Sequence, residues 1–507
     1  PFLIMTRIIT LCLILLTQTL NAQSKYDYTW VLGYDHYIVG PTGITNGGTI
    51  IDFNQTPYLM THESLPTFEV LASISDQNGK LIAYTDGCRV ANADHEIMVH
   101  GDTISPGYIY DHYCYGGAYP NFQGSLFLPL PGNSKRYALF HLRRVKHLFL
   151  GRDLLYSIVD TEGDNGKGDL INKNQVAWTD TLLNDYISAV KHANGRDWWV
   201  VMPRVYYNGY HVGLLTPEGV QYKGIQAIGK DSLPGYCCGQ TAFSPDGSKY
   251  LKHIPQFGVE ILDFDRCTGL FSNPVFIDLS ADSSGSGGVV VSPNGRYLYV
   301  PATLQVYQYD LWASNIAASR QTVAVYESFL SPFPTPFNQA ALGPDGKIYI
   351  TSPNSNNILH VINKPDLPGS ACDLVQHGVQ LLTLTGFFAP NFPNYRLGPL
   401  KESICDSLPQ DSTILSTNGI RTGQQYPMLL YPNPASESFT LLKMSDIDER
   451  SGSFSLYGPS GALLCTKNIR QTDRSIEIKI TDFPAGLYYW EIVWDSGPHE
   501  SGKVQRL

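Results

Sequence analysis

Charged residues are scarce in this chain, and the absence of basic blocks, zinc-binding cysteine pairs and long apolar runs limits the partners that it can have. Asp, Glu, Lys and Arg make up 16% of the 507 residues, and the net charge is −10 without a basic block. This balance argues against nucleic acid or an anionic membrane surface as the partner. No C-x-x-C pair is present, so a zinc ribbon is not expected. No apolar run is long enough to span a bilayer, so no transmembrane segment is expected in the mature chain.

Familiar catalytic motifs are missing as well. The chain has no P-loop, no dinucleotide-binding fingerprint and no G-x-S-x-G elbow; residues 284–288 (SGSGG) lack the first glycine of that elbow. Residues 95–100 (HEIMVH) come close to a zincin helix, but His95 and His100 are five residues apart instead of four. The turn-forming residues around them indicate a strand with turns. A metalloprotease is therefore not expected, and no metal site is predicted here.

The N-terminus has the pattern of a secretory signal. Residues 5–7 (MTR) give a basic start, residues 8–16 an apolar stretch, and residues 20–22 (LNA) a small-residue cleavage site before Gln23. Residues 1–22 are therefore expected to be a signal peptide, with residues 1–4 as an extension upstream of its start.

The body repeats one phrase, which ends in a turn. The clearest copies are TAFSPDG at residues 241–247, VVVSPNG at 289–295 and AALGPDG at 340–346, each followed at once by a second apolar run. Asp-Gly or Asn-Gly between two apolar runs is typical of a β-hairpin, because the tight turn needs positive φ. Weaker copies of the turn are found at residues 78–79, 132–133 and 194–195.

A period of about fifty residues with up to four strands per unit is typical of propeller blades. Residues 265–269 (DRCTG) also resemble the D-x-x-T-G link of YVTN-type propellers. With 46 Gly and 32 Tyr, the composition fits an all-β protein. We predict a seven-bladed β-propeller over residues 23–405, closed by pairing of N-terminal strands with residues 387–397. The alternative, an array of β-sandwiches, would not return to the same phrase at this period.

The last eighty residues form a second unit. Five short, partly alternating apolar runs between residues 439 and 493 predict a small Ig-like β-sandwich over residues 428–507. Before it, residues 406–427 are rich in Ser, Thr, Asp, Asn, Gly and Gln and indicate a linker.

This second unit resembles the type A C-terminal sorting domain of the type IX secretion system of Bacteroidota. The resemblance rests on four features: the opening YPNPA, a glycine in a turn, a later P-x-G-x-Y turn, and a basic end. The matching residues are Tyr431, Pro432, Asn433, Pro434, Gly461, Gly486, Lys503 and Arg506. An adhesive or spacer Ig-like module is the alternative.

The resemblance implies where the protein acts. Such domains are recognised by the secretion machinery and are usually removed, often with attachment of the protein to surface lipopolysaccharide. We therefore expect passage through the periplasm and a secreted or outer-surface location. The body is also similar to propeller proteins that carry the same C-terminal domain. This similarity predicts the fold of the body but not its biochemical activity.

Cysteines favour an oxidising compartment but leave the pairing open. Seven lie in the body, an odd number, and Cys465 lies in the second unit. Cys88 with Cys114, and Cys372 with Cys405, are the pairs we predict, although spacing alone does not decide connectivity.

Three features are candidates for a ligand site. Residues 160–169 (DTEGDNGKGD) gather oxygen ligands that would suit calcium, without the EF-hand spacing; a solvated loop is the alternative. The polar residues that we predict to line the propeller channel are His141, His192, Arg204 and His253. The alternative is that His192 and Asp197 satisfy backbone groups within a blade, and because no mutual geometry is fixed, we favour it.

Tyrosines in two glycine-rich segments offer a binding surface. They are Tyr108, Tyr110, Tyr113, Tyr115 and Tyr119 in the first segment, and Tyr206, Tyr207 and Tyr210 in the second. Exposed rings would stack on sugars or anchor a protein, and buried ones would pack between blades. Because no catalytic motif is visible, we favour a glycan- or protein-binding module. An extracellular polysaccharide hydrolase or lyase, with its site at the channel, is the alternative.

Overall fold

The chain divides into two compact units, residues 1–410 and residues 411–507, which are described separately. The computed structural model describes residues 24–34, 47–67, 69–144, 150–183, 185–205, 208–230, 238–282, 285–387, 389–406, 428–431, 435–443, 450–458, 461–473, 475–495 and 500–506.

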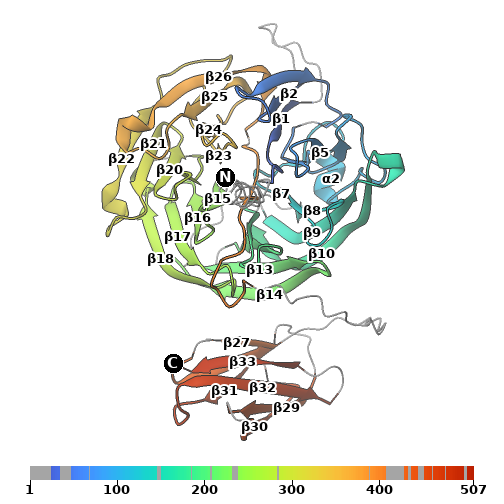
Figure 1. Cartoon of the computed structure of the whole chain (residues 1–507), viewed down its shortest axis with the longest axis vertical. Helices are drawn as coiled ribbons and strands as arrows, with labels where there is room; N and C mark the ends of the chain where they lie inside the picture. The colour runs from blue at the N-terminus through green and yellow to red at the C-terminus, as the bar shows by residue number, and fades with distance from the viewer. Residues whose placement is uncertain are drawn as a thin grey trace, which may run out of the picture. The chain divides into compact units, whose positions relative to one another are not determined.

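The described strands of the first unit form seven antiparallel sheets arranged around a ring (Figure 1). The two three-stranded sheets contain β1 (Thr29–Tyr34), β2 (Gly47–Asp52) and β3 (Leu59–Glu63), then β4 (Ala72–Ser75), β5 (Leu81–Thr85) and β6 (Val90–Asn92). The third sheet contains β7 (Ser125–Pro129), β8 (Arg136–Arg144), β9 (Leu150–Asp160) and β10 (Asp169–Leu183). The fourth contains β11 (Ser188–Lys191), β12 (Trp198–Pro203), β13 (Gly209–Thr216) and β14 (Gly219–Ala227).

The remaining three sheets of the ring also have four strands each. The fifth contains β15 (Gln240–Phe243), β16 (Lys249–Ile254), β17 (Gly258–Phe264) and β18 (Phe271–Asp278). The sixth contains β19 (Val290–Val291), β20 (Tyr297–Ala302), β21 (Gln305–Asp310) and β22 (Gln321–Val325). The seventh contains β23 (Ala340–Leu342), β24 (Ile348–Ile350), β25 (Asn356–Ile362) and β26 (Leu374–Thr385). The all-β prediction is thus confirmed for the described residues.

Helical structure in the described part is confined to short segments. They are α2 (Tyr108–Tyr113) and the 3-10 turns η1 (Asp164–Gly166), η2 (Ser280–Asp282), η3 (Ala317–Ser319) and η4 (Gly369–Cys372).

A tight turn joins the first two strands of six of the described sheets, at the dipeptides that the sequence singles out. Each turn has a glycine whose φ lies between 73° and 91°, a region that glycine enters without steric cost. These are Gly79, Gly132, Gly195, Gly247, Gly295 and Gly346.

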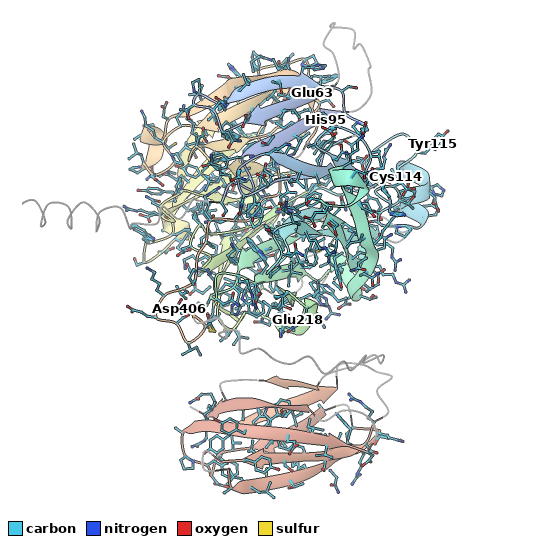
Figure 2. All side chains as sticks on the ribbon, turned by 45° about the vertical axis from the view of Figure 1, so that its right-hand side comes forward. Glu63, His95, Cys114, Tyr115, Glu218 and Asp406 are labelled. Atoms are coloured by element: carbon cyan, nitrogen blue, oxygen red, sulfur yellow. A yellow bond between two sulfur atoms is a disulfide. The ribbon has the colours of Figure 1, made fainter. Side chains whose placement is uncertain are left out.

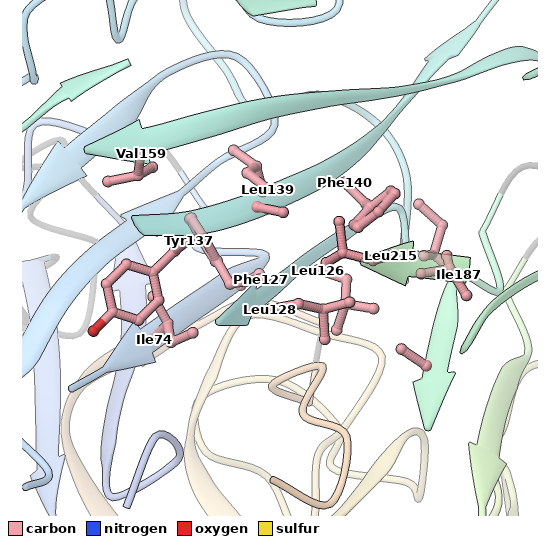
Figure 3. Close-up of a cluster of buried hydrophobic side chains, with 14 of the residues drawn as sticks. Ile74, Leu126, Phe127, Leu128, Tyr137, Leu139, Phe140, Val159, Ile187 and Leu215 are labelled. Carbon is pink, nitrogen blue, oxygen red and sulfur yellow. The ribbon is translucent and has the colours of Figure 1, made fainter. Parts of the chain in front are cut away.

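The first strand of each four-stranded sheet lies nearest the centre of the ring (Figure 1). There β11 lies against β15, β15 against β19 and β19 against β23. In the first strand of the third sheet both faces are covered, and its sequence is apolar without alternation: Leu126, Phe127 and Leu128 of β7 are all fully buried (Figure 3).

The first and last sheets lie side by side and complete the ring. The hydroxyls of Thr49 in β2 and Thr383 in β26 are 2.9 Å apart, and the Thr383 N–H donates to the Thr49 hydroxyl over 3.1 Å. Trp30 in β1 meets Tyr349 in β24 edge to face, with ring centroids 5.4 Å apart.

No strand is present in the described residues between 386 and 406, which we call the closing segment. The prediction that residues 387–397 pair with the N-terminal strands is therefore wrong. Pro390 and Pro393 lack the N–H that a ladder needs, which accounts for the missing strand. The segment still lies near β1, because the Phe392 and Trp30 ring centroids are 6.0 Å apart.

The second unit consists of two sheets in its described part. One contains β27 (Met428–Tyr431), β28 (Ser438–Lys443) and β31 (Ser475–Lys479); the other contains β30 (Leu463–Ile469), β29 (Gly452–Tyr457), β32 (Gly486–Trp494) and β33 (Glu500–Arg506). Both contribute to one core, in which Phe439 and Ile478 of the first sheet join Phe454, Tyr488 and Ile492 of the second. The predicted linker, residues 406–427, lies outside the described residues apart from Asp406.

Candidate functional site

The centre of the ring holds a cavity of about 320 Å³. First strands of the fourth to seventh sheets form its wall on one side, and residues 390–394 with Arg396 form it on the other. Among the described lining residues the one carboxylate is Asp27, and it is paired with Arg396 over 2.6 Å. No histidine is among those lining residues, so the wall carries no acid–base pair of the kind that hydrolysis needs.

Asn391 of the closing segment fixes one side of this cavity. Its amide nitrogen donates to the carbonyls of Ser125 and Ile187, over 3.0 and 3.1 Å, and its oxygen accepts from the Gln123 amide over 3.0 Å. Asn391 is nearly buried. One side chain therefore satisfies open backbone groups at the beginning of the third and fourth sheets.

Glutamines close the inner sheet edges in the same way. Gln240 donates to the Ala340 carbonyl over 2.7 Å and accepts from the Val289 and Ala340 N–H groups. Gln123 bridges to the backbone of Thr241, and Gln339 donates to the Gly239 carbonyl over 3.0 Å. Because these contacts join residues at the beginning of first strands, that end of the channel is filled by buried amides.

The closing segment continues along the ring with further side-chain contacts. The Tyr395 hydroxyl donates to the Phe127 carbonyl over 2.8 Å, and the Tyr395 carbonyl accepts from Ser24 and Lys191. Arg266 of the fifth sheet donates to the Gly398 carbonyl over 2.6 Å.

His141, the first predicted channel residue, lies outside the channel wall. It is buried in β8 between two hydroxyls, with Ser105 Oγ 2.7 Å from Nδ1 and Ser157 Oγ 3.0 Å from Nε2. Burial lowers the pKa of His141 to about 3, so the ring is neutral at physiological pH.

His192 bonds to backbone groups of its own turn and of the fifth sheet. Nδ1 accepts from the Asn194 N–H over 3.0 Å, and Nε2 donates to the Cys267 carbonyl over 3.1 Å. Burial is the main cause of its lowered pKa. Asp197 is held by Asn194 and Arg196 in the same turn.

Arg204 belongs to a network between the third and fourth sheets. It pairs with Asp180 of β10 over 2.8 Å, and Asp180 also accepts from His211 Nε2 over 3.0 Å. His211 Nδ1 lies 2.8 Å from the Tyr222 hydroxyl, and Trp178 stacks parallel to the imidazole. Burial lowers the pKa of His211.

His253 is fully buried against the backbone of Gly287, and burial lowers its pKa to about 4. None of the four predicted residues is among the described residues that line the cavity. They lie in or beside three different sheets and have different surroundings, so the structure does not bring the four together.

Sequence reasoning missed two buried carboxyl groups. Glu69 accepts from the Phe387 N–H over 2.9 Å, and burial raises its pKa to about 8. Asp185 accepts from the N–H groups of Phe122 and Cys238, and burial raises its pKa to about 7. The ring centroids of Phe122 and Phe387, whose N–H groups bond to Asp185 and Glu69 respectively, are 6.4 Å apart, so the two carboxyl groups lie in neighbouring parts of the ring.

A third buried group, also missed, joins the fourth and fifth sheets. Lys252 Nζ lies 2.9 Å from Glu260 Oε2 and donates to the Tyr210 hydroxyl over 2.6 Å. Tyr210 lies in β13 and not in a loop; it is fully buried and donates to Glu260, so it packs between sheets, which is the alternative that the sequence left open. Tyr206 and Tyr207 lie outside the described residues.

In the loop that was a candidate for calcium, two of the carboxylates are bonded to other side chains. Asp160 pairs with Arg136 over 2.9 Å, and Asp169 pairs with His100 over 2.8 Å. His95, the other histidine of the zincin-like stretch, contacts the Tyr84 hydroxyl instead. Within the described ranges, no group of three or more His, Cys, Asp or Glu residues is placed to hold a metal ion.

The first tyrosine segment is exposed and covalently fixed. Tyr108 and Tyr113 belong to α2 and Tyr115 follows it; their exposed fractions are 39%, 45% and 99% (Figure 2). Tyr119 is buried, and its hydroxyl accepts from the Arg144 N–H over 2.9 Å. A disulfide joins Cys114, the residue after the helix, to Cys88, the pairing that the sequence suggested.

The second predicted disulfide is wrong. Cys405 is bonded to Cys267, and Cys372 is a buried free thiol. Cys267 lies in the D-x-x-T-G turn after β17, so the bond holds the end of the closing segment to the fifth sheet. Sequence separation could not identify this pair, because the two cysteines are 138 residues apart.

The proposed sorting residues lie mainly at strand ends and turns of the second unit. Gly461 has φ 80° between β29 and β30, and Gly486 begins β32. Arg506 donates to the carbonyls of Phe483 and Thr481, which holds the chain end to the turn before β32. The backbone of Lys503 pairs with Tyr489 in β33.

The opening of the sorting pattern is less fully described. Tyr431 ends β27 opposite Thr440 of β28. Pro432, Asn433 and Pro434 lie outside the described residues.

Comparison with protein families matches residues 429–504 to the secretion system C-terminal sorting domain. The predicted resemblance is therefore confirmed: this part is a type IX sorting domain, which marks proteins for the cell surface or the outside. The described part contains no helix of the length and apolarity required to cross a membrane.

Similar solved structures are distant, and no curated protein matches the chain. A functionally unknown protein from Desulfotomaculum acetoxidans DSM 771 is 13% identical, over 68% of this chain and 96% of that one, with a TM-score of 0.39. Two provisionally named 6-phosphogluconolactonases are also similar. The one from Bacteroides fragilis NCTC 9343 is 12% identical over 71% and 97% of the chains, with a TM-score of 0.42. The one from Bacteroides uniformis ATCC 8492 is 14% identical over 84% and 98%, with a TM-score of 0.35.

Proposed function

We propose that this chain, which the type IX machinery exports by its C-terminal sorting domain, is a seven-bladed β-propeller that binds an extracellular glycan or protein. In this proposal residues 23–405 are the propeller, residues 406–427 the linker, and residues 428–507 an Ig-like sandwich. The signal peptide, residues 1–22, carries the chain to the periplasm before export.

The tyrosine segment, residues 108–115, carries the binding proposal. It holds three exposed rings and is fixed next to Cys88 by the disulfide at Cys114. Rigid, exposed aromatic side chains offer contact area at little entropic cost, which favours recognition of sugars or proteins. The buried amides that close one end of the channel favour binding at the periphery over chemistry at the centre.

The test follows the protein purified from the culture medium. It is incubated with bacterial and algal polysaccharides and with outer-surface protein extracts, and both retention and fragment masses are measured. We expect retention of intact polymer or of a protein, and loss of retention in the double variant Tyr113→Ala/Tyr115→Ala. Leu330→Ala, which removes another exposed apolar side chain far along the sequence, is the matched control. Unchanged retention by the tyrosine variant would contradict the proposal.

An extracellular hydrolase or lyase is the second candidate, favoured by the raised pKa values of Glu69 and Asp185. A carboxyl group that is protonated near neutral pH has the proton that a general acid must donate. New fragment masses that disappear in Glu69→Gln or Asp185→Asn would establish this candidate in place of the binding module.

A further inference from the structure

Trp312 differs from the other tryptophans of the ring in its exposure. Its exposed fraction is 65%, whereas Trp30, Trp178, Trp198 and Trp199 are between 1% and 5% exposed. Burial of an indole is strongly favourable. A solvent-exposed indole on a fixed backbone therefore suggests that the ring contacts a ligand or partner.

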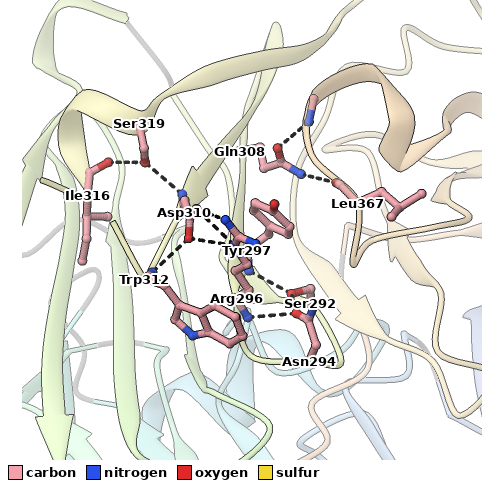
Figure 4. Close-up of polar contacts among 11 residues, drawn as sticks. Ser292, Asn294, Arg296, Tyr297, Gln308, Asp310, Trp312, Ile316, Ser319 and Leu367 are labelled. Carbon is pink, nitrogen blue, oxygen red and sulfur yellow. Dashed lines mark hydrogen bonds and ion pairs between the residues drawn. The ribbon is translucent and has the colours of Figure 1, made fainter. Parts of the chain in front are cut away.

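Neighbouring polar groups hold the chain around Trp312 (Figure 4). Asp310, at the end of β21, accepts from the Trp312 N–H over 3.0 Å and pairs with Arg296 over 2.8 Å. The Arg296 guanidinium carbon lies 5.3 Å from the indole centroid. The Asp310 N–H donates to Ser319, which in turn donates to the Ile316 carbonyl over 2.6 Å. Both ends of the loop are thus fixed to one aspartate.

The loop is longer than closure of its hairpin requires. In the fifth sheet Asp265 accepts from the Cys267 N–H and the Thr268 hydroxyl, and the chain returns to β18 by Phe271. In the sixth sheet the chain returns to β22 only at Gln321. The additional residues leave Trp312 in solvent while Leu311 is buried.

Hydrogen-bond donors around the indole are available to a ligand. In the described part of the chain, Arg296 Nη1, Trp312 Nε1 and Asn294 Nδ2 have no protein acceptor, whereas Arg296 Nε and Nη2 are taken by Asp310. The Asn294 side-chain oxygen accepts from the Ser292 hydroxyl and the Arg296 N–H, which aligns it with the arginine.

A hexose ring matches this combination of an apolar plane and donors. A pyranose with equatorial hydroxyls has a flat C–H face for stacking and hydroxyl oxygens at its rim that accept hydrogen bonds. Because Arg296 is already neutralised by Asp310, nothing selects an acidic sugar. A stable protein interface needs about 800 Å² from each partner, and in residues 311–320 Trp312 is the exposed large apolar side chain.

We infer that Trp312, Arg296 and Asn294 form a subsite for neutral chains of hexopyranoses with equatorial hydroxyls, separate from the tyrosine segment. In Figure 1, β21 and β22 lie on the opposite side of the ring from α2. One long polymer would contact both places, and the second contact gains from the raised effective concentration. The inference narrows the proposed binding function to glycans, but its test does not depend on the tyrosines.

The test uses acrylamide quenching of tryptophan fluorescence in the full exported protein. Trp312 should give most of the quenchable signal. We expect laminarihexaose or cellohexaose, at about 10 mM because a single stacking contact binds weakly, to lower the quenching constant by about half. Trp312→Ala should remove most of the quenchable component and all of the protection, since the partly exposed Trp490 of the second unit remains. Leu304→Ala, another exposed apolar residue of the sixth sheet, should leave both unchanged.

The outcomes separate this inference from the proposed function. Protection that persists in Tyr113→Ala/Tyr115→Ala supports the subsite even if retention on polymers is lost. Absence of protection by both hexasaccharides overturns it, as does protection that survives Trp312→Ala. Protection by a surface protein but by neither glucan would overturn the glycan assignment. Thermal unfolding of Trp312→Ala checks that the variant is folded.

Discussion

The four-stranded sheets and the closing segment hold the ring in opposite ways. Each sheet is built from neighbouring strands joined by antiparallel ladders, such as β15 with β16, where Gln240 pairs with His253. The closing segment has no ladder in its described part and relies on single side-chain bonds to distant residues, such as Tyr395 with Ser24. The sheets therefore form by pairing between strands that are neighbours in the sequence. Ring closure depends instead on a few individual side chains of the closing segment, which belong to no repeated pattern.

The largest expected effect comes from removing the disulfide of the closing segment. In the loop-entropy relation, loss of the 138-residue Cys267–Cys405 loop lowers the free energy of unfolding by about 5 kcal/mol, and loss of the 26-residue Cys88–Cys114 loop by about 3.5 kcal/mol. Urea unfolding of the two paired Cys→Ser variants measures both values. An equal or smaller loss for the longer loop would mean that the closing segment does not restrain the ring.

Asn391→Ala should follow in size. It leaves the Ser125 and Ile187 carbonyls and the Gln123 amide without their partner in a buried place, which costs about 3 kcal/mol. The matched control is Asn394→Ala, which removes a bond donated to the Pro245 carbonyl and a bond accepted from the Arg396 N–H at a half-buried site, and should cost about 2 kcal/mol. Equal losses in urea unfolding would show that the channel amides do not contribute more than ordinary loop bonds.

Glu69 makes closure depend on pH. Its pKa is about 8 in the folded ring and near 4.3 in the unfolded chain, so the folded state holds the proton that the unfolded state has lost. Stability from this group is complete below the unfolded pKa and is lost as pH rises through the folded pKa. The expected loss between pH 6 and pH 8 is about 2 kcal/mol.

Glu69→Gln should remove this share of the pH dependence, because the amide still accepts from Phe387 and does not ionise. Urea unfolding at pH 6 and pH 8 gives the comparison. Asp185, whose pKa is about 7, adds a dependence that remains in the variant. The same difference between pH 6 and pH 8 in both proteins would mean that Glu69 does not titrate in this range.

The sequence predicted the parts of the ring that follow local rules. Gly247 and the equivalent glycines predict hairpins, because the tight turn itself requires a positive φ and glycine adopts it readily. The role of Asn391 could not be predicted in this way, because an asparagine in a stretch with two prolines is typical of an ordinary loop. A weak signal was present at Gln240 and Gln339, two glutamines that directly begin or precede a first strand.

The same limit applies to the candidate site. His141 and His253 were selected for their chemistry, yet both lie within strands among apolar residues, where burial is the usual outcome. For Tyr115, next to two glycines, the sequence left exposure and packing both open, and the structure shows it almost fully exposed. Trp312 was missed because exposure of a single indole depends on where one loop leaves its sheet.

The smallest effect compares the same turn position in two sheets. Gly247 and Gly295 have φ of 75° and 77°, so alanine costs about 1 kcal/mol of backbone strain at either. A Cβ at residue 295 would meet nothing within 4 Å, whereas at 247 it would lie 2.6 Å from Val190 Cγ2 and 2.7 Å from Arg266 Cδ. Arg266 holds the Gly398 carbonyl. Gly247→Ala should therefore cost about 1 kcal/mol more in urea unfolding, because overpacking adds to strain. This difference should become smaller in the Arg266→Ala background, which removes one of the two close contacts, but it should not disappear, because the contact with Val190 remains.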